Sequence, residues 1–234
     1  MYTLNILPPS ANSMCVRILL RAAKLPFEEI DVYGKTREEA YIAKCPAHHA
    51  PLLESAELPK GCLPDSVAIM QYLCDRHELE QWYSTSLTQR AMINACLQYQ
   101  AGALYPMVAK VVYPLFGFPP YPADLHGAPI PDTVKTEGRL AAQAALPELL
   151  SVIHEFFFEG DFIGGKTPGI ADLRFASTLE WLPVAAYEFP SWARDYLHRM
   201  ESELGEHYAQ PAADLRALVQ FTLDQTSGSA NVAH

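Results

Sequence analysis

The sequence predicts two domains of different fold class, a small α/β domain followed by an all-helical domain. Residues 1–79 contain short apolar runs typical of strands, and these runs alternate with short helical patterns. Residues 88–222 instead carry apolar side chains at the three-and-four spacing of amphipathic helices. We expect residues 80–87 to link the two domains, and residues 223–234, which are small and polar, to form a flexible tail.

The α/β domain is expected to begin with a strand–helix–strand unit. The two strands are YTLNI (2–6) and FEEIDV (27–32), and the helix between them covers about 14–23. A second helix over REEAYIAK (37–44) leads to a return strand in APLLES (50–55). Because these strands are short and apolar, they need a sheet that helices cover.

The second domain is expected to consist of helices that bury one face each. Apolar periodicity predicts helices over 91–112, 133–158, 170–187 and 192–204. The segment YPLFGFPPYPADLHGAPIP (113–131) is rich in proline and aromatic residues, so it is not expected to continue a helix.

Composition excludes several classes of protein. The chain has 234 residues, of which 50% are hydrophobic and 19% charged, so it is expected to fold around a core rather than to be disordered. A formal net charge of −10, without a run of lysine or arginine, disfavours binding to nucleic acid or to an anionic membrane. No amino-terminal segment combines a basic start with an apolar run, and no run approaches the roughly 18 apolar residues of a membrane span. We therefore expect a cytoplasmic protein.

Cysteine and histidine usage predicts neither a disulfide framework nor a metal site. The five cysteines are odd in number and widely spaced, and no C-x-x-C pair occurs among them: Cys15, Cys45, Cys62, Cys74 and Cys96. We therefore expect reduced thiols. His48 and His49 are adjacent but have no third ligand in view, so they are expected to be surface or ligand-contact residues without a metal.

Small polar side chains crowd the start of the first helix, in PPSANSM (8–14). Ser10 and Ser13 can both cap a helix that begins near Met14, because a hydroxyl accepts a hydrogen bond from an unpaired N–H of the first turn. The same arrangement also suits an anion, and above all a thiolate, since a hydroxyl donor and the helix dipole act on it together. Both interpretations stay open from the residues alone.

A second polar helix start occurs in LPDSVAIMQYL (63–73). Asp65 and Ser66 form an ordinary beginning of a helix. They also offer a carboxylate to an ammonium group, and a hydroxyl with a backbone N–H to a carboxylate. These are the groups that the α-amino acid end of a ligand requires.

A proline marks the start of the return strand, in HHAPLLE (48–54). Proline removes a hydrogen-bond donor from the sheet, so Pro51 belongs at the beginning of the strand or in a cis turn. The chain therefore runs through a strand, a hydroxyl-headed helix, a strand, a helix, an X-Pro strand and a helix headed by Asp-Ser. This order resembles the glutathione transferase superfamily, and the resemblance covers nearly the whole chain.

Three motifs carry the resemblance. PDSVAIMQYL (64–73) is similar to the family's glutathione motif ESxAIxxYL, and HAPLLE (49–54) is similar to its cis-proline motif VPxL. FEGDFIGGKTPGIADLRFASTLEW (158–181) is similar to the family's buried helix start, G-x-x-x-S/T-x-A-D.

Segments outside these motifs resemble particular classes of the family. Residues 80–100 and 110–117 look like the theta class, whereas SANS (10–13) is similar to bacterial transferases and glutathione-dependent β-etherases. The resemblance implies a thioredoxin-like amino-terminal domain, a helical-bundle carboxy-terminal domain, and glutathione as co-substrate without a metal. It also implies a homodimer, which would cover apolar residues on the helix over 91–112.

The resemblance implies which groups act on the glutathione thiol. Ser10 falls where the theta class has its catalytic serine, and Asn12 falls where some bacterial classes use an asparagine beside the thiol. Ser13 stays a third candidate for the thiol contact. Cys15 lies inside the helix, so the cysteine chemistry of omega-like members is not expected and packing is its predicted role.

The resemblance also implies how glutathione is bound. Ala50 matches the residue whose backbone pairs with the cysteinyl part of glutathione, and Pro51 matches the cis-proline after it. Asp65 and Ser66 match the clamp of the γ-glutamyl group. His49 stands where theta members often carry a lysine, which weakens the attraction to the glycyl carboxylate because histidine is mostly neutral at pH 7.

The buried helix start departs from the family pattern. Gly169 occupies the place of the Ser or Thr cap, so Asp172 is expected to reach back to the backbone N–H of Gly169. In an alternative frame Thr167 is the cap and Pro168 the first helical residue. Either frame makes this motif structural.

The resemblance implies a reaction in which the glutathione thiolate attacks a small hydrophobic electrophile, such as an epoxide or an aryl or alkyl halide, as in the detoxification of xenobiotics. Alternatives are a glutathione-dependent β-etherase, dehalogenase or disulfide reductase, and a non-catalytic binding protein, against which the retained Ser10, Asp65 and Ser66 argue. The expected acceptor pocket contains Leu7, Pro9, Tyr105, Val108, Tyr113 and Phe116. Met107, Phe118 and Tyr121 extend its aromatic wall, although all these residues can equally be core or dimer contacts.

Overall fold

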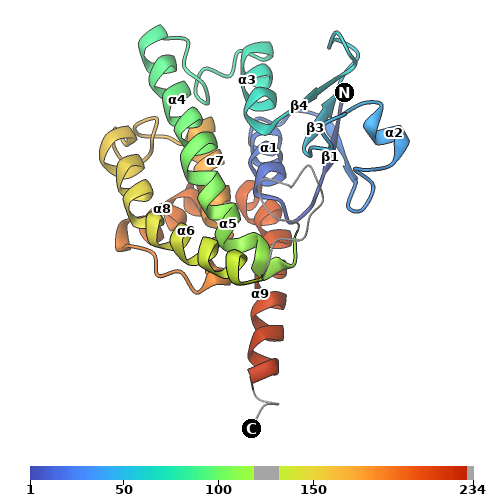
Figure 1. Ribbon diagram of the computed structural model, residues 1–234. Helices are drawn as coiled ribbons and strands as arrows, with labels where there is room; N and C mark the ends of the chain where they lie inside the picture. The colour runs from blue at the N-terminus through green and yellow to red at the C-terminus, as the bar shows by residue number, and fades with distance from the viewer. Residues whose placement is uncertain (119–131, 231–234) are drawn as a thin grey trace.

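A computed structural model describes residues 1–118 and 132–230, and it contains a mixed sheet beside a bundle of helices (Figure 1). The strands are β1 (Tyr2–Ile6), β2 (Phe27–Asp31), β3 (Leu52–Glu54) and β4 (Cys62–Pro64). Their order in the sheet is β2-β1-β3-β4, with β1 parallel to β2 and antiparallel to β3. The expected strand–helix–strand unit and its return strand are confirmed.

Helices cover both faces of this sheet. α1 (Ala11–Ala22) and α3 (Ser66–Arg76) lie on the face toward the helical domain, and the short α2 (Glu39–Ile42) lies on the other face (Figure 1). The large apolar side chains of α1 are fully buried, so they form the common core of the two domains. This is the thioredoxin-like arrangement that the sequence predicts.

The first helix begins earlier than the apolar periodicity predicts. α1 starts at Ala11 rather than near Met14, and Ser10 is its N-cap by backbone conformation. The Ser10 side chain makes no capping hydrogen bond, so the prediction that both serines cap the helix is wrong. Periodicity detects the first large apolar residue, Met14, and misses the small buried residues Ala11 and Ser13 that precede it.

The carboxy-terminal domain is all-helical, as expected. Its helices are α4 (Leu87–Tyr99), α5 (Tyr105–Phe116), α6 (Asp132–Val152), α7 (Ile170–Leu179), α8 (Ser191–Leu204) and α9 (Glu206–Ala230). A π-helical turn, η1 (Gln100–Leu104), joins α4 to α5 without a break. Pro106 has no N–H for the carbonyl of Gly102, which accounts for the wider turn at this point.

Several helix ends differ from the predictions. α6 passes into a second π-helical turn, η2 (Ile153–Phe157), and α7 is followed by a 3-10 turn, η3 (Leu182–Ala185), instead of continuing to residue 187. α5 runs through Pro114 to Phe116, and Gly117 ends it in the left-handed conformation at φ 70°. Residues 119–131, most of the expected proline-rich segment, lie outside the described residues.

The end of the chain is more helical than its composition indicates. The helices expected from periodicity end at residue 204 within a helical domain expected to reach residue 222, and residues 223–234 are expected to form a flexible tail. α9 instead begins after Gly205 and continues to Ala230. It is fixed to the first domain by Asp214, whose carboxylate lies 2.8 Å from the guanidinium of the buried Arg17 on α1. A partner distant in the sequence, which periodicity cannot detect, therefore orders α9.

α7 begins in the protein interior, where its free N–H groups need protein partners. Gly169 is the N-cap, and its N–H donates to Asp172 Oδ2 at 2.9 Å, so the predicted backbone contact is confirmed and the Thr167 frame is wrong. Asp172 Oδ1 accepts from the Ile163 N–H at 2.9 Å and from the Tyr196 hydroxyl at 3.0 Å. Burial raises the pKa of Asp172 to about 6, although these hydrogen bonds lower it.

A side chain at position 169 would disturb this start. A Cβ atom on Gly169 would lie 3.0 Å from the carbonyl oxygen of Trp82, which itself accepts from the Ile170 N–H at 2.9 Å. The missing Ser or Thr cap is thus explained by the close approach of the segment between the two domains.

We predict that Asp172→Ala lowers the free energy of unfolding by about 3 kcal/mol or more, because it leaves the buried N–H groups of Gly169 and Ile163 without an acceptor and removes one of the two acceptors of Tyr196. The measurement is denaturant unfolding followed by circular dichroism. Asp161→Ala is the matched control: Asp161 is 73% exposed and pairs with Arg199 only at 4.0 Å, so its loss should cost less than about 1 kcal/mol. Equal effects of the two changes would contradict the role of Asp172.

Candidate functional site

Two helix starts and the cis-proline meet at one edge of the sheet. The register pairs Asn5 of β1 with Leu52 of β3, and Leu52 with Pro64 of β4. The end of β1, the beginning of β3 and the end of β4 therefore share an edge. α1 follows β1 and α3 follows β4, so the amino termini of both helices lie at this edge, beside the residues that precede Leu52.

The first turn of α1 offers one hydroxyl that is not engaged in the fold. Ser10 is partly exposed, and its hydroxyl makes no hydrogen bond with the described residues. Ser13 is fully buried, and its hydroxyl accepts from the Leu7 N–H at 3.2 Å. Ser13 thus fixes the loop between β1 and α1, while Ser10 is available to a ligand.

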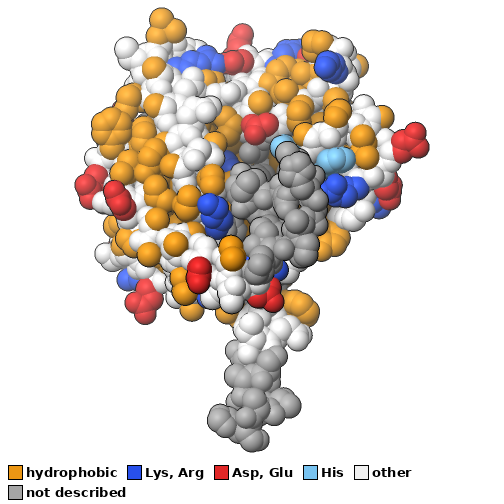
Figure 2. Space-filling model, viewed as in Figure 1, with side chains coloured by type: hydrophobic (Ala, Val, Ile, Leu, Met, Phe, Trp, Pro, Cys, Tyr) orange, Lys and Arg blue, Asp and Glu red, His pale blue; other side chains and the backbone are white. Residues whose placement is uncertain are grey.

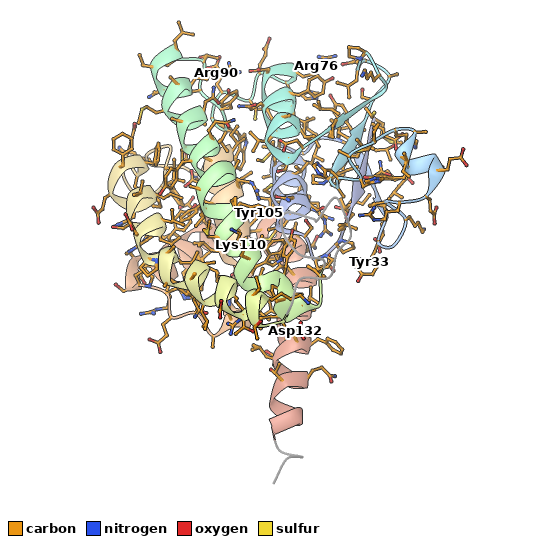
Figure 3. The ribbon with its side chains drawn as sticks, in the orientation of Figure 1. Tyr33, Arg76, Arg90, Tyr105, Lys110 and Asp132 are labelled. Carbon is orange, nitrogen blue, oxygen red and sulfur yellow. The ribbon has the colours of Figure 1, made fainter. Side chains whose placement is uncertain are left out.

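Asn12 connects the first turn of α1 to the helical domain. Its Nδ2 donates to the Tyr105 hydroxyl at 3.0 Å, and the hydroxyls of Tyr105 and Tyr113 lie 3.0 Å apart. Tyr105 lies on α5 near the centre of the molecule (Figure 3). The Asn12 Oδ1 atom is buried without a hydrogen-bond partner. Polar groups therefore continue from α1 into the predicted acceptor pocket.

Trp181, which the sequence analysis did not single out, brings the aromatic residues of this pocket together. Its ring centroid lies 5.9 Å from that of Tyr105, 5.7 Å from that of Tyr113 and 6.4 Å from that of Phe116. Its indole N–H donates to the carbonyl of Pro9 at 3.0 Å, which joins the two domains next to Ser10. In the sequence Trp181 lies inside the expected helix over 170–187, so nothing distinguished it from an ordinary core residue.

The other expected pocket residues differ in burial and in the part of the fold that they contact. Val108 is fully buried in the common core, so its assignment to the pocket surface is corrected to a packing role. Leu7 is half-buried and packs on the small core beneath α2. Met107 and Phe118 are partly exposed, and Phe118 lies 5.3 Å from Phe116 between ring centroids. Tyr121 lies outside the described residues.

The start of α3 combines a carboxylate with an open helix terminus. Asp65 Oδ1 accepts from the N–H groups of Val67 and Ala68 at 2.9 and 3.0 Å, so Asp65 is the N-cap. The N–H of Ser66, the first helical residue, is not taken by these bonds. This N–H and the rest of the Asp65 carboxylate can meet an amino acid group.

The Ala50–Pro51 peptide bond is cis, as the cis-turn interpretation requires. The carbonyl of His49 accepts from the Tyr41 hydroxyl at 2.6 Å, which fixes the backbone before this bond. The imidazole of His49 is exposed, and His48 contacts the carbonyl of Thr36 through Nδ1 at 3.1 Å. Within the part of the chain that the structure describes, no three ligating side chains gather into a metal site.

One of the five thiols contacts this edge, where Cys45 Sγ donates to the His49 carbonyl at 3.6 Å. All five are unpaired, and four are buried. Cys15 donates to the Asn12 carbonyl at 3.2 Å, and burial raises its pKa to about 11, so it stays protonated at neutral pH. Its packing role is confirmed.

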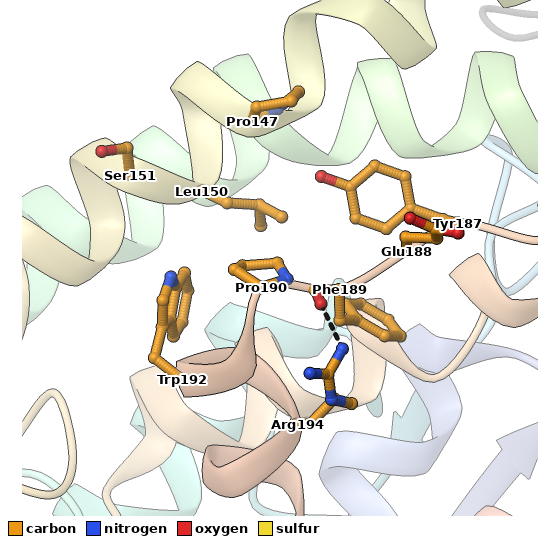
Figure 4. Close-up of a pocket in the computed structure, with 9 residues that line it drawn as sticks. All are labelled: Pro147, Leu150, Ser151, Tyr187, Glu188, Phe189, Pro190, Trp192 and Arg194. Carbon is orange, nitrogen blue, oxygen red and sulfur yellow. Dashed lines mark hydrogen bonds between the residues drawn. The ribbon is translucent and has the colours of Figure 1, made fainter.

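Two cavities lie outside the sheet edge. One of about 730 Å³ lies between α6 and the chain before α8, where it is lined by Leu150, Tyr187 and Trp192 (Figure 4). It contains none of the predicted site residues. A second, of about 510 Å³, lies between α5 and the start of α6 and includes Tyr113 and Phe118. None of the helices described is long and apolar enough to cross a membrane.

Known proteins share both the sequence and the fold. Residues 4–81 match the domain described as glutathione S-transferase, N-terminal domain. The chain is 32% identical to glutathione S-transferase 2 of Anopheles gambiae over 178 residues, which cover 74% of this chain and 76% of that protein. It is 26% identical to glutathione S-transferase theta-3 of Mus musculus, over 78% of this chain and 73% of the relative.

The whole architecture recurs in the crystal structure of human glutathione transferase theta-2 in complex with glutathione and an unknown ligand. The TM-score is 0.74 at 20% identity, over 97% of this chain and 92% of the human one. With a thioredoxin-like domain, a helical domain and this level of identity to the mosquito protein, the chain belongs to the glutathione S-transferase family.

Proposed function

We propose that the protein is a glutathione transferase in which the Ser10 hydroxyl donates a hydrogen bond to the glutathione thiolate. The observation that carries the proposal is the free hydroxyl of Ser10 at the start of α1, at the edge where α3 also begins. The Asn12 amide is the second donor near the sulfur, because only one of its N–H groups is needed for Tyr105. Ser13 positions the loop from below.

Glutathione binds along the same edge in this proposal. The γ-glutamyl ammonium pairs with Asp65, and its carboxylate takes the N–H and hydroxyl of Ser66 at the positive end of α3. The backbone of Ala50, before the cis Pro51, pairs with the cysteinyl part, and His49 faces the glycyl carboxylate. The exposure of His49 is consistent with contact to a ligand at the rim.

Formation of the glutathione thiolate near neutral pH requires only modest electrostatic stabilisation. A free thiol has a pKa of about 8.5, and each unit of lowering corresponds to about 1.4 kcal/mol in favour of the thiolate. One charge-assisted hydrogen bond and a helix dipole together supply about one to two units. No nucleophile from the protein is then needed.

The acceptor is a small hydrophobic electrophile. In the proposed reaction the sulfur forms a bond to an electrophilic carbon, while a halide leaves or an epoxide C–O bond opens and its oxygen takes a proton. Pro9, Tyr105, Tyr113 and Phe116 support this assignment, because they gather around Trp181 beside the thiol site. Turnover of a panel of aryl halides, alkyl halides and epoxides, with product masses determined, tests it.

We predict that Ser10→Ala raises the pKa of the bound glutathione thiol by about one unit, because it removes a donor to the thiolate. The pKa is measured from the ultraviolet absorbance of the thiolate as a function of pH. The dissociation constant of glutathione should change little.

Two further serine variants make this test specific. Ser86 is also an N-cap without a capping hydrogen bond, at α4, so Ser86→Ala is the matched control and should leave the thiol pKa at the wild-type value. Ser13→Ala should mainly lower stability, by about 1 kcal/mol or more, since it leaves the Leu7 N–H without its acceptor. A pKa shift with Ser13→Ala but not with Ser10→Ala would transfer the role to Ser13.

We predict that Asp65→Asn weakens glutathione binding about tenfold, since it removes the charge that pairs with the ammonium but keeps an oxygen for Val67 and Ala68. Titration calorimetry gives the dissociation constant. Asp65→Ala, which loses the cap as well, should bind as weakly and also be less stable by about 1 kcal/mol. If only the alanine variant bound weakly, Asp65 would be a cap and not a clamp.

We also propose a homodimer that buries the exposed side of α4 and α6. Apolar side chains gather over these helices (Figure 2). Leu87 and Met92 of α4 are 85% and 38% exposed, and Val134 and Leu140 of α6 are 53% and 54% exposed. Pairing of two copies would remove such a surface from water in both subunits.

We predict a mass of about twice the 26.0 kDa of one chain in light scattering at micromolar concentration. Met92→Lys combined with Leu140→Lys should reduce the mass to that of one chain, because two charges would enter an apolar interface. A wild-type mass near that of one chain, with full activity, would reject the dimer.

A further inference from the structure

A buried cation on α7 has no counter-ion among residues 1–118 and 132–230. Arg174 is 5% exposed, and its Nη1 donates to the Thr178 hydroxyl only at 3.4 Å. Its Nε is buried without a hydrogen-bond partner, and among the residues described it forms no ion pair. The other buried arginine, Arg17, has a carboxylate oxygen of Glu29 at 3.0 Å and one of Asp214 at 2.8 Å. An unpaired guanidinium in the interior is costly, so its presence needs a reason.

The ionisable groups around Arg174 do not neutralise it. Cys15 of α1 and Cys96 of α4 are buried thiols whose pKa values are raised to about 11 and about 12, so both are neutral at neutral pH. Asp65 at the start of α3 accepts from the α3 backbone. Asp172, two residues before Arg174, accepts from its own set of donors across α7. Among the residues described, no carboxylate therefore forms an ion pair with Arg174, and the carboxylates of Asp65 and Asp172 offset its charge only in part.

This charge faces the thiol site. The guanidinium carbon of Arg174 lies 4.5 Å from the ring centroid of Tyr105, whose hydroxyl accepts from Asn12 in the first turn of α1. Arg174 is also the charged group that most favours the thiolate form of Cys15, one helical turn after Asn12. Its positive potential thus reaches the first turn of α1, where the glutathione sulfur is proposed to lie.

We propose that Arg174 is a positioning residue that stabilises the glutathione thiolate from behind Tyr105 and Asn12. The Tyr105 ring holds the guanidinium in place and separates it from the sulfur, so Arg174 acts through the field and through these two side chains. In an interior of low dielectric constant, a fixed cation favours the charged form of a nearby thiol over the neutral form. This inference rests on the proposed function, since it requires glutathione at the start of α1.

The test compares variants that keep or remove the charge at position 174. Arg174→Met removes it with little change in volume, and we expect the pKa of the bound glutathione thiol to rise by about one unit. At a pH below the pKa this is about a tenfold loss of thiolate. Arg174→Lys keeps the charge, and the pKa should stay within a few tenths of a unit of the wild type. Arg21→Met is the matched control, because it removes one charge from the far end of α1.

The outcomes separate charge from packing. Thermal unfolding and titration calorimetry first establish that each variant folds and binds glutathione, and Arg174→Gln is a second neutral variant should the methionine variant not fold. A wild-type thiol pKa in both neutral variants would overturn the inference, and so would an equal shift with lysine, which would indicate packing. If wild-type protein bound glutathione without forming a thiolate near neutral pH, the proposed function itself would fail, and this inference with it.

Discussion

The structure depends on burying α7 along its whole length, which is possible because Asp172 and the Trp82 carbonyl satisfy donors at its start. Every residue from Ile170 to Leu179 is buried. A helix terminus in the interior leaves N–H groups that no water can reach, and one carboxylate meets those of Gly169 and Ile163 while it also anchors Tyr196. Once α7 is fixed, it carries Arg174 and, just beyond its end, Trp181 to the boundary between the two domains.

The sheet supplies the other half of the site by its connectivity. The parallel pair β1–β2 requires a crossover helix, α1, and the antiparallel return through β3 and β4 makes α3 begin at the edge where α1 begins. Two positive helix ends therefore converge through the backbone pairing of β1 with β3. The aromatic pocket, in contrast, is joined to the first domain by the hydrogen bond from the Trp181 indole to the Pro9 carbonyl.

The parts of the fold that depend on local patterns could be predicted from the sequence, and the parts that depend on distant partners could not. The cap at Asp65, the contact of Asp172 with Gly169 and the cis Pro51 each involve groups within a few residues, so they follow from short motifs. Val108 is apolar and beside aromatic residues, and no pattern tells a pocket wall from a core position. Arg174 carried no signal in the sequence, because its partner Tyr105 is 69 residues away, the difference between the two residue numbers.

In the proposed site, local electrostatic fields rather than the net charge of the chain determine whether a thiolate is stabilised. The net charge of −10 opposes the approach of an anion, but salt screens exposed charges over about 8 Å under physiological conditions. A dipole end or a buried guanidinium within the site is screened far less, because low-dielectric protein and not water separates it from the ligand. In the proposed site, the starts of α1 and α3 together with Arg174 would therefore act on the sulfur more strongly than distant surface carboxylates do. An acidic surface, which favours solubility, is in this way compatible with a positive site at the boundary between the domains.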